Sequence, residues 1–174
     1  MNENEVIDRE MIRDCLARIS RGEDRRDASL IRSGYWPDAV FDFGIFTGNF
    51  EEYLAWVVPG SPAVTNTLHT LGQTLISLRG SSAATETHVT CYHRMNLGAQ
   101  ERDVTMAGRY LDRLEKRDGQ WRIIQRTLIY DWMQDFGPSA DWSRGLMGAP
   151  FREERYTGRT HGDPSVDFFQ SNDK

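Results

Sequence analysis

The feature that most constrains the fold is a long β-strand pattern that occupies residues 73–132. Two turn signals, Gly80-Ser81-Ser82 and Asp118-Gly119, divide this stretch, and the second is typical of a hairpin turn that needs positive φ angles. Polar and apolar residues alternate between the turns, with many Thr, Val, Ile and Tyr side chains. The four predicted strands are Gln73–Leu78, Ala83–Leu97, Val104–Lys116 and Gln120–Trp132. Long strands joined by tight turns predict an antiparallel sheet whose apolar face other elements must cover.

Helical patterns precede the strands and can provide that cover. Residues 5–20 place apolar side chains at three- and four-residue spacings, which predicts an amphipathic helix. We expect Gly22 to break this helix and a second, short helix to occupy residues 24–33. Asn49 followed by Glu52 is a capping pair that predicts a third helix. Helices first and strands afterwards indicate an α+β fold, with the N-terminal helices packed on one face of a curved antiparallel sheet.

The last part of the chain has no regular pattern. We assign residues 1–135 to one α+β domain and residues 136–174 to an irregular tail, in which Gly, Pro, Ser and charged residues dominate. Trp142, Leu146 and Phe151 are candidates for contacts over the open end of the sheet. The tail is therefore expected to cover the pocket or a neighbouring subunit.

Composition and charge exclude several classes of protein. The net charge of -5 disfavours a nucleic-acid binder or a protein with a polybasic membrane patch. No apolar stretch approaches the roughly 20 residues that span a bilayer, and residues 1–5 are polar and acidic, unlike a secretory signal. Cys15 and Cys91 lie in different predicted elements and are expected to be reduced, buried thiols. These features favour a cytoplasmic protein without nucleic-acid or membrane partners.

The four histidines do not have the spacing of a metal site. His69, His88, His93 and His161 include no i, i+4 pair on a predicted helix. His88 and His93 are five residues apart in one predicted strand, so their side chains should point to opposite faces. The sequence also lacks a glycine-rich phosphate loop and a Gly-x-Ser-x-Gly nucleophile elbow. We therefore expect neither a metal ion nor a cofactor.

Three polar residues are candidates for chemistry. Asp24 opens the predicted second helix, and His69 lies just before the predicted sheet. Arg126 occupies the same alternating face of a strand as Ile124 and Leu128, where an unpaired guanidinium is costly. A structural salt bridge or an exposed strand face would explain Arg126 equally well. A hydrogen-bonded histidine in the core or at the surface is the simpler explanation of His69 alone.

Several segments together resemble a known family. They are Gly22-Glu23-Asp24-Arg25-Arg26-Asp27, Tyr35-Trp36-Pro37-Asp38-Ala39, the isolated His69, Val104-Thr105-Met106-x-Gly108 and Arg117-Asp118-Gly119-x-Trp121-Arg122-Ile123. The chain from about residue 7 to residue 136 resembles the SnoaL-like branch of the nuclear transport factor 2-like superfamily. Within that branch it is most similar to scytalone dehydratases and hexachlorocyclohexane dehydrochlorinases. The resemblance implies a cone-shaped sheet, the cystatin-like roll, with the helices on its concave face.

The resemblance also implies roles for individual residues. Asp24 and His69 match the Asp–His pair of the family, and Arg126 matches the pocket arginine of the dehydrochlorinases. His93 matches a second histidine of scytalone dehydratases if one gap is allowed. A neutral imidazole is a suitable base near pH 7, and a carboxylate on its far nitrogen fixes the tautomer and stabilises the protonated form. Such a dyad would abstract a proton and drive an elimination without a cofactor, while Arg126 stabilises the leaving group or developing oxyanion.

Aromatic residues are candidates for the pocket lining. Any one of them is explained as well by core or interface packing, but together they indicate a small hydrophobic substrate, aromatic or cyclic. The candidate substrate-binding residues are Tyr35, Trp36, Phe43, Trp56, Tyr92, His93, Tyr130 and Trp132.

Three classes of function remain open at this point. The first is a lyase of the dehydratase or dehydrohalogenase type, including carbon–carbon lysis with the same base. The second is an isomerase, hydrolase or cyclase of the same superfamily. The third is a non-catalytic companion subunit that resembles the β chain of ring-hydroxylating dioxygenases. The Asp–His pair favours the lyase. The resemblance implies a homo-oligomer, a trimer first and a dimer second, formed through the outer face of the sheet, with Thr85, Thr87, Val89 and Cys91 as candidate contacts.

Overall fold

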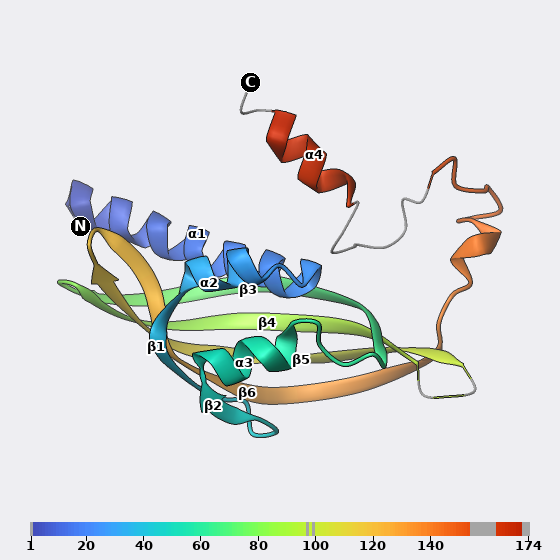
Figure 1. Ribbon diagram of the computed structural model, residues 1–174, viewed down its shortest axis with the longest axis horizontal. Helices are drawn as coiled ribbons and strands as arrows, with labels where there is room; N and C mark the ends of the chain where they lie inside the picture. Colours follow the sequence, from blue (N-terminus) through green and yellow to red (C-terminus); the bar gives the residue numbers. More distant parts are fainter. Residues whose placement is uncertain (1, 97, 99, 154–162, 172–174) are drawn as a thin grey trace.

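The computed structural model describes residues 2–96, 98, 100–153 and 163–171. Its α+β architecture confirms the predicted fold class (Figure 1). The elements in chain order are α1 (Glu3–Arg25), α2 (Ala28–Gly34), β1 (Tyr35–Asp42), β2 (Thr47–Asn49), α3 (Phe50–Val57), β3 (Val64–Arg79), β4 (Ser82–Asn96), β5 (Glu101–Arg117), β6 (Gln120–Pro138), the short 3-10 helix η1 (Trp142–Arg144) and α4 (Pro164–Gln170).

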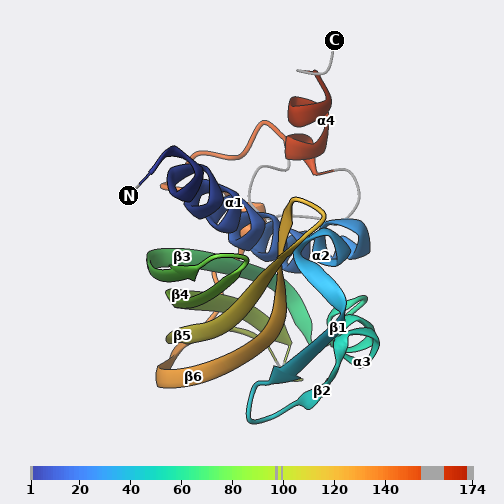
Figure 2. The ribbon, with the colours of Figure 1, turned by 90° about the vertical axis from the view of Figure 1, so that its left-hand side faces the viewer.

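One curved, unclosed sheet forms the body of the molecule. Its strand order is β2-β1-β6-β5-β4-β3, and every neighbouring pair is antiparallel except β1 and β6, which run parallel. Figure 2 shows the sheet curling beneath α1 and α2, which lie across its concave side. The predicted antiparallel meander is therefore correct for β3 to β6. The additional parallel pair places β1 beside the last strand of the sheet.

Helix α1 is longer than predicted. It begins in a capping box formed by Asn2 and Glu5, and it continues through Gly22 to Arg25. The predicted break at Gly22 is wrong because this glycine serves the packing of two helices. A Cβ atom at Gly22 would lie 2.9 Å from Cγ1 of Ile31 in α2. The helix ends instead at Arg25, and the capping residue Arg26 adopts the left-handed conformation, with a φ of 53°, that turns the chain.

Side-chain caps set the ends of the two following helices. Asp27 accepts hydrogen bonds from the backbone N–H groups of Ser29 and Leu30, so α2 begins at Ala28 rather than at residue 24. Asn49 and Glu52 form the predicted capping box, which starts α3. The corner between α1 and α2 fixes the last turn of α1 above one end of the sheet, where the candidate site lies.

The first long strand begins earlier than its sequence pattern indicates. β3 starts at Val64, so His69 lies within the sheet, paired with Cys91 of β4, and not before it. β3 is an edge strand, and its register with β4 shifts between Leu71 and Thr74. The shift interrupts the alternation of polar and apolar residues, and the sequence therefore predicted a strand that begins only at Gln73.

The core lies between the helices and the concave face of the sheet. Ile12, Leu16 and Ile19 of α1 are buried against Trp121 and Ile123 of β6. Burying such large apolar side chains drives the docking of the helix on the sheet. In the described residues, no helix is both long and apolar enough to cross a membrane.

The C-terminal part is more regular than expected. β6 continues to Pro138, and a further helix, α4, lies on the side of α1 that faces away from the sheet (Figures 1 and 2). The Asp163 carboxylate, just before α4, lies 3.2 Å from Nε of Arg25. The guanidinium of Arg94, near the end of β4, lies over the ring of Trp142, 5.8 Å from the ring centre, whereas Leu146 is half exposed.

Candidate active site

A cavity of about 260 Å³ opens between the end of α1, α3 and the concave face of β3 to β6. Mostly apolar and aromatic side chains line it. The polar lining residues include Glu23, Arg26, Thr67, His69 and His93. Oε2 of Glu23 lies 3.7 Å from Nε2 of His69, and the rings of His69 and His93 are 6.2 Å apart. A small apolar cavity with a few convergent polar groups is typical of a ligand site.

Asp24 and His69 lie in direct contact. Nδ1 of His69 is 2.7 Å from the Asp24 carboxylate, and both side chains are largely buried. The same carboxylate accepts the backbone N–H of His69 at 3.0 and 3.1 Å. This N–H belongs to the free edge of β3, so Asp24 both satisfies the edge strand and holds the ring. The contact leaves Nε2 as the ring nitrogen that remains for chemistry.

Glu23 faces that second nitrogen. Its side chain is 5% exposed, and its Oε2 lies 3.7 Å from Nε2 of His69. Its Oε1 accepts a hydrogen bond from the hydroxyl of Tyr53. Sequence analysis did not select Glu23, although it directly precedes Asp24 in the segment that carries the family resemblance. The signal was hidden because consecutive residues of a helix point about 100° apart, and only the last turn above the cavity lets both carboxylates reach one imidazole.

The surroundings shift the pKa values of the two cavity histidines in opposite directions. Burial lowers the pKa of His69, but the hydrogen bond to Asp24, the contact with Cys91 and the charge of Glu23 outweigh burial and raise it well above 6.5. Burial, followed by the charges of His69 and Arg26, lowers the pKa of His93 to about 4. His93 is therefore a neutral ring at pH 7.

Arg126 lies behind the cavity wall rather than in it. Its guanidinium forms two hydrogen bonds with Asp112, at 2.8 and 2.9 Å, and stacks 3.9 Å from the ring centre of Tyr110. Arg126 is not among the residues that line the cavity, so the structure does not support direct contact with a leaving group. Its contacts are those of a structural salt bridge, one of the alternative explanations that the sequence left open for Arg126. A register shift in β6 also moves Ile124 off the face of Arg126, and Ile123 takes the buried position.

Four of the eight predicted substrate-binding residues line the cavity: Phe43, Trp56, His93 and Tyr130.

The other four predicted substrate-binding residues lie elsewhere. Tyr35 is fully buried in the core among other aromatic rings. Trp36 donates its indole N–H to the carbonyl of Glu115, outside the cavity. Tyr92 donates to Asp103 from the outer face, because it alternates with the inward-pointing Cys91 and His93. Trp132 is half exposed. The aromatic content of a strand did not reveal which face each ring occupies.

The cavity also contains residues that sequence analysis did not select for it. Among them are Tyr53 of α3, Tyr110 of β5, Met95 of β4 and Met106 of β5. Alternation from His93 predicts Met95 on the same face, so the strand pattern could have located it. Tyr53 depends on the docking of α3, for which the sequence gives no signal. The described part of the tail contributes no lining residue, and His161 lies outside the described residues.

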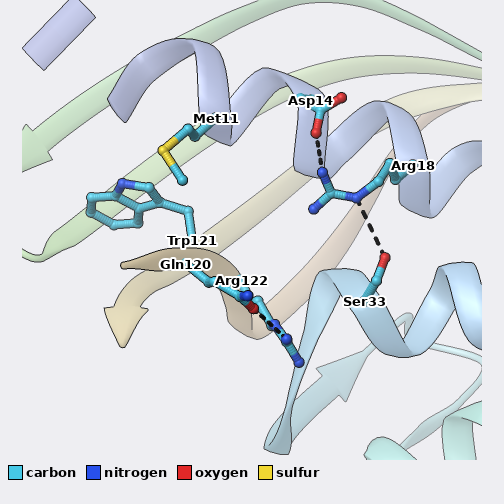
Figure 3. A pocket seen from close by; sticks show the side chains of 7 residues that line it. All are labelled: Met11, Asp14, Arg18, Ser33, Gln120, Trp121 and Arg122. Atoms are coloured by element: carbon cyan, nitrogen blue, oxygen red, sulfur yellow. Dashed lines mark hydrogen bonds and ion pairs between the residues drawn. The ribbon is translucent and has the colours of Figure 1, made fainter. Parts of the chain in front are cut away.

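Two other hollows lack comparable chemistry. Figure 3 shows the one between α1, α2 and the start of β6, of about 350 Å³, in which Arg18 contacts both Asp14 and Ser33. The second hollow, of about 380 Å³, is lined by residues of β3, β4, β5 and β6, which include Leu75 and Leu111. In the part of the chain that the structure describes, no group of three His, Cys, Asp or Glu side chains is arranged to hold a metal ion.

Comparison with known proteins gives a consistent fold assignment. The family model of the SnoaL-like domain matches residues 4–127. The Kfla4162 protein of Kribbella flavida has a TM-score of 0.69 at 18% identity, over 75% of this chain and 95% of that one. A scytalone dehydratase-like protein of Novosphingobium aromaticivorans has a TM-score of 0.68 at 18% identity, over 80% and 95%. Hexachlorocyclohexane dehydrochlorinase LinA-type3 of Novosphingobium barchaimii has a TM-score of 0.68 at 20% identity, over 86% and 97%. At these identities the likeness shows the fold alone. No curated protein matches the chain.

The raised pKa of His69 predicts a pH-dependent stability. The Asp24–His69 contact stabilises the folded state fully below the unfolded-state pKa of histidine, about 6.5, and this stabilisation is lost as pH rises through the higher folded-state pKa. We expect the free energy of unfolding, from urea titrations, to decline over that alkaline interval. The decline in the free energy of unfolding should be smaller in His69→Asn than in the wild type. In His88→Gln, an exposed control, it should equal that of the wild type. An equal decline in all three proteins would contradict the assignment.

The buried Arg126–Asp112 pair predicts a second stability effect. Asp112→Ala leaves the guanidinium buried without its bidentate partner, so we expect a loss of about 3–5 kcal/mol in urea unfolding. The double variant Arg126→Met/Asp112→Leu should recover much of this loss because it removes both charges. A single variant as stable as the wild type would show that Asp112 is not the main partner of Arg126.

Proposed function

The chain belongs to the SnoaL-like domain family, and on that premise we propose that it is a cofactor-independent lyase of the dehydratase or dehydrohalogenase type. The observation that carries the proposal is the 2.7 Å contact between Asp24 and Nδ1 of His69 beside an aromatic-lined cavity. An imidazole held in this way by a carboxylate is a positioned general base. The names of a scytalone dehydratase-like protein and a dehydrochlorinase among the similar structures support the same class of reaction.

The proposed reaction is the removal of a proton next to an activating carbonyl, with loss of a group from the neighbouring carbon. Nε2 of His69 takes the proton, and Asp24 stabilises the imidazolium that forms. Thr67 and His93 supply polar atoms for the carbonyl: neither the Thr67 hydroxyl nor Nδ1 of His93 has a hydrogen-bond partner among the described residues. Phe43, Trp56 and Tyr130 would hold the cyclic or aromatic body of the substrate.

Variants of the dyad test this function. We expect His69→Ala and Asp24→Asn each to lower turnover by about 10²- to 10⁴-fold, the usual contribution of positioned general-base catalysis. The assay follows formation of cyclohexenone from β-hydroxycyclohexanone and β-chlorocyclohexanone. His88→Ala, on the outer face of β4, is the control and should keep wild-type turnover. Circular dichroism of each variant verifies that the fold is intact.

The results separate the proposed function from its alternatives. Wild-type rates in both dyad variants, or no turnover of either probe by the wild type, would contradict the lyase. Incorporation of oxygen from labelled water into the product would indicate a hydrolase instead. A companion subunit would co-purify with a larger chain whose activity His69→Ala spares.

We also propose that the protein is a homo-oligomer, a trimer before a dimer. Thr85, Thr87, Val89 and Cys91 cannot form its interface, because they point to the concave side and are buried there. The outer side instead exposes Leu75 and Leu111 beside one hollow. Leu75→Glu should shift the mass measured by light scattering towards the monomer, whereas Val6→Glu on α1 should not. A monomeric wild type would exclude the oligomer.

A further inference from the structure

Glu23 occupies a position that the general-base mechanism does not use. Its carboxylate is buried, lines the cavity and lies between two charged networks. On one side Oε1 accepts the Tyr53 hydroxyl and lies 3.7 Å from Nη1 of Arg126. On the other side Oε2 lies 3.7 Å from Nε2 of His69, the nitrogen left free by Asp24. A buried carboxylate beside the reacting nitrogen requires an explanation.

Two arginines contribute positive charge near Glu23, but among the described residues neither donates a hydrogen bond to its carboxylate, and Arg26 donates instead to the carbonyl of Val57. Asp112 takes both strong hydrogen bonds of Arg126, and Nη1, the atom nearest Glu23, has no hydrogen-bond partner among the described residues. Asp24 already compensates one positive charge on His69. Two largely buried carboxylates therefore flank one imidazole. One proton shared between Nε2 and Glu23 lowers the cost of burying this arrangement.

We propose that Glu23 is the second acid–base catalytic residue of this site, which shares one proton with Nε2 of His69 and donates it to an oxygen leaving group. The inference rests on the lyase proposed above and narrows its substrate. A halide leaves without a proton, whereas hydroxide is a poor leaving group unless an acid protonates it. The substrate class is therefore a β-hydroxy carbonyl compound, and the reaction is a dehydration.

The steps balance without a further reactant. His69 removes the proton from the carbon next to the carbonyl, and its C–H electron pair forms the carbon–carbon double bond. The carbon–oxygen bond breaks as Glu23 protonates the departing oxygen, so water leaves. The imidazolium then returns a proton from Nε2 to the Glu23 carboxylate, 3.7 Å away, and restores the starting state. Arg126 stabilises the transient Glu23 carboxylate through Nη1 and is a positioning residue, not a catalytic one.

The same geometry predicts the stereochemistry. Acid and base lie 3.7 Å apart on one wall of the cavity, so both act on the same face of the substrate. The proton and the hydroxyl should therefore leave in a syn elimination. An anti elimination would need an acid on the opposite wall.

The sign of the pH dependence separates a shared proton from a lone base. The charged and titratable groups packed around His69 are Asp24, Glu23, Arg26, Tyr53, Cys91, His93, Tyr110 and Arg126. Burial lowers the pKa of His69, but the hydrogen bond to Asp24 and the charge of Glu23 outweigh it, so the ring holds its proton to a higher pH than a free histidine. If the shared proton is required, the rate of dehydration should fall as pH rises through the raised pKa of His69. If His69 acts alone as a base, the rate should rise over the same range, because the neutral ring is then the active form.

Nitrogen NMR of the His69 ring tests the shared proton without any substrate. We expect Glu23→Gln to shift the titration of His69 to lower pH, because a negative neighbour of Nε2 is lost. Glu23→Asp keeps the negative charge but places it farther from Nε2, so it should shift the titration of His69 less than Glu23→Gln does. Glu10→Gln, an exposed change on the same helix, should leave it in place. Titration unchanged in Glu23→Gln would overturn the proposal even if the protein is a lyase.

A pair of probes tests the acid role. Glu23→Gln should lower turnover of β-hydroxycyclohexanone by about 100-fold or more but change that of β-chlorocyclohexanone by less than about tenfold. His69→Ala should lower turnover of both probes by about 10²- to 10⁴-fold. An equal loss on both probes, or no loss on the hydroxy probe, would overturn the acid role while the lyase stands. A wild type inactive on both probes would contradict the lyase and with it the acid role, and the NMR titration would still decide the shared proton.

Discussion

The contact between Asp24 and His69 is the interaction on which the candidate site depends. Asp24 accepts both the ring N–H and the backbone N–H of His69, so one carboxylate anchors the end of α1 to the open edge of β3. Arg9 adds a second link by donating to the carbonyl of Ile76 on the same edge. An edge strand that is satisfied by a helix cannot pair with another chain there. The interaction that orients the proposed base is therefore also part of the fold.

The position of Asp24 follows from the corner that ends α1. Gly22 lets α2 approach within van der Waals distance, and Arg26 adopts the left-handed conformation that stops the helix. Asp27 then caps α2 at once. Because the turn is so short, Asp24 and its neighbour Glu23 are held rigidly above the cavity. A longer connection would leave both carboxylates free to move and would weaken the positioning on which acid–base chemistry relies.

Buried charge is arranged in pairs throughout this end of the molecule. Arg126 and Asp112 neutralise each other beneath Tyr110, and His93 is kept neutral by burial and by the charge of His69. Electrostatic interactions gain strength where water is excluded, so each unpaired group has a large effect on its neighbours. Glu23 is the group that connects these networks. Its environment is consequently sensitive to proton movement in the cavity, which is the physical basis of the role inferred for it.

Much of the architecture could be predicted from the pattern of the chain. The amphipathic face of α1, the capping box at Asn49 and the hairpin at Asp118-Gly119 are local features, and each forms as expected. The errors occurred where a residue serves a distant neighbour. Gly22 suggested a helix end but allows close packing against Ile31, and the register shift in β3 concealed the early start of that strand.

The sequence by itself determined the fold class, because periodicity and caps depend on residues that are close together in the chain. Its short motifs indicated the family, and the resemblance to that family, rather than any local pattern, implied Asp24 and His69 as a candidate pair. Only the tertiary structure decided which polar groups meet. In the folded chain, Glu23 lies beside Nε2 of His69, and Arg126 pairs with Asp112 behind the cavity wall. The aromatic residues are divided between the cavity, the core and the outer face of the sheet. The reason is physical: contacts between residues on different elements, 14 positions apart for Arg126 and Asp112 and 45 for Asp24 and His69, depend on strand register and helix docking, which no local pattern specifies.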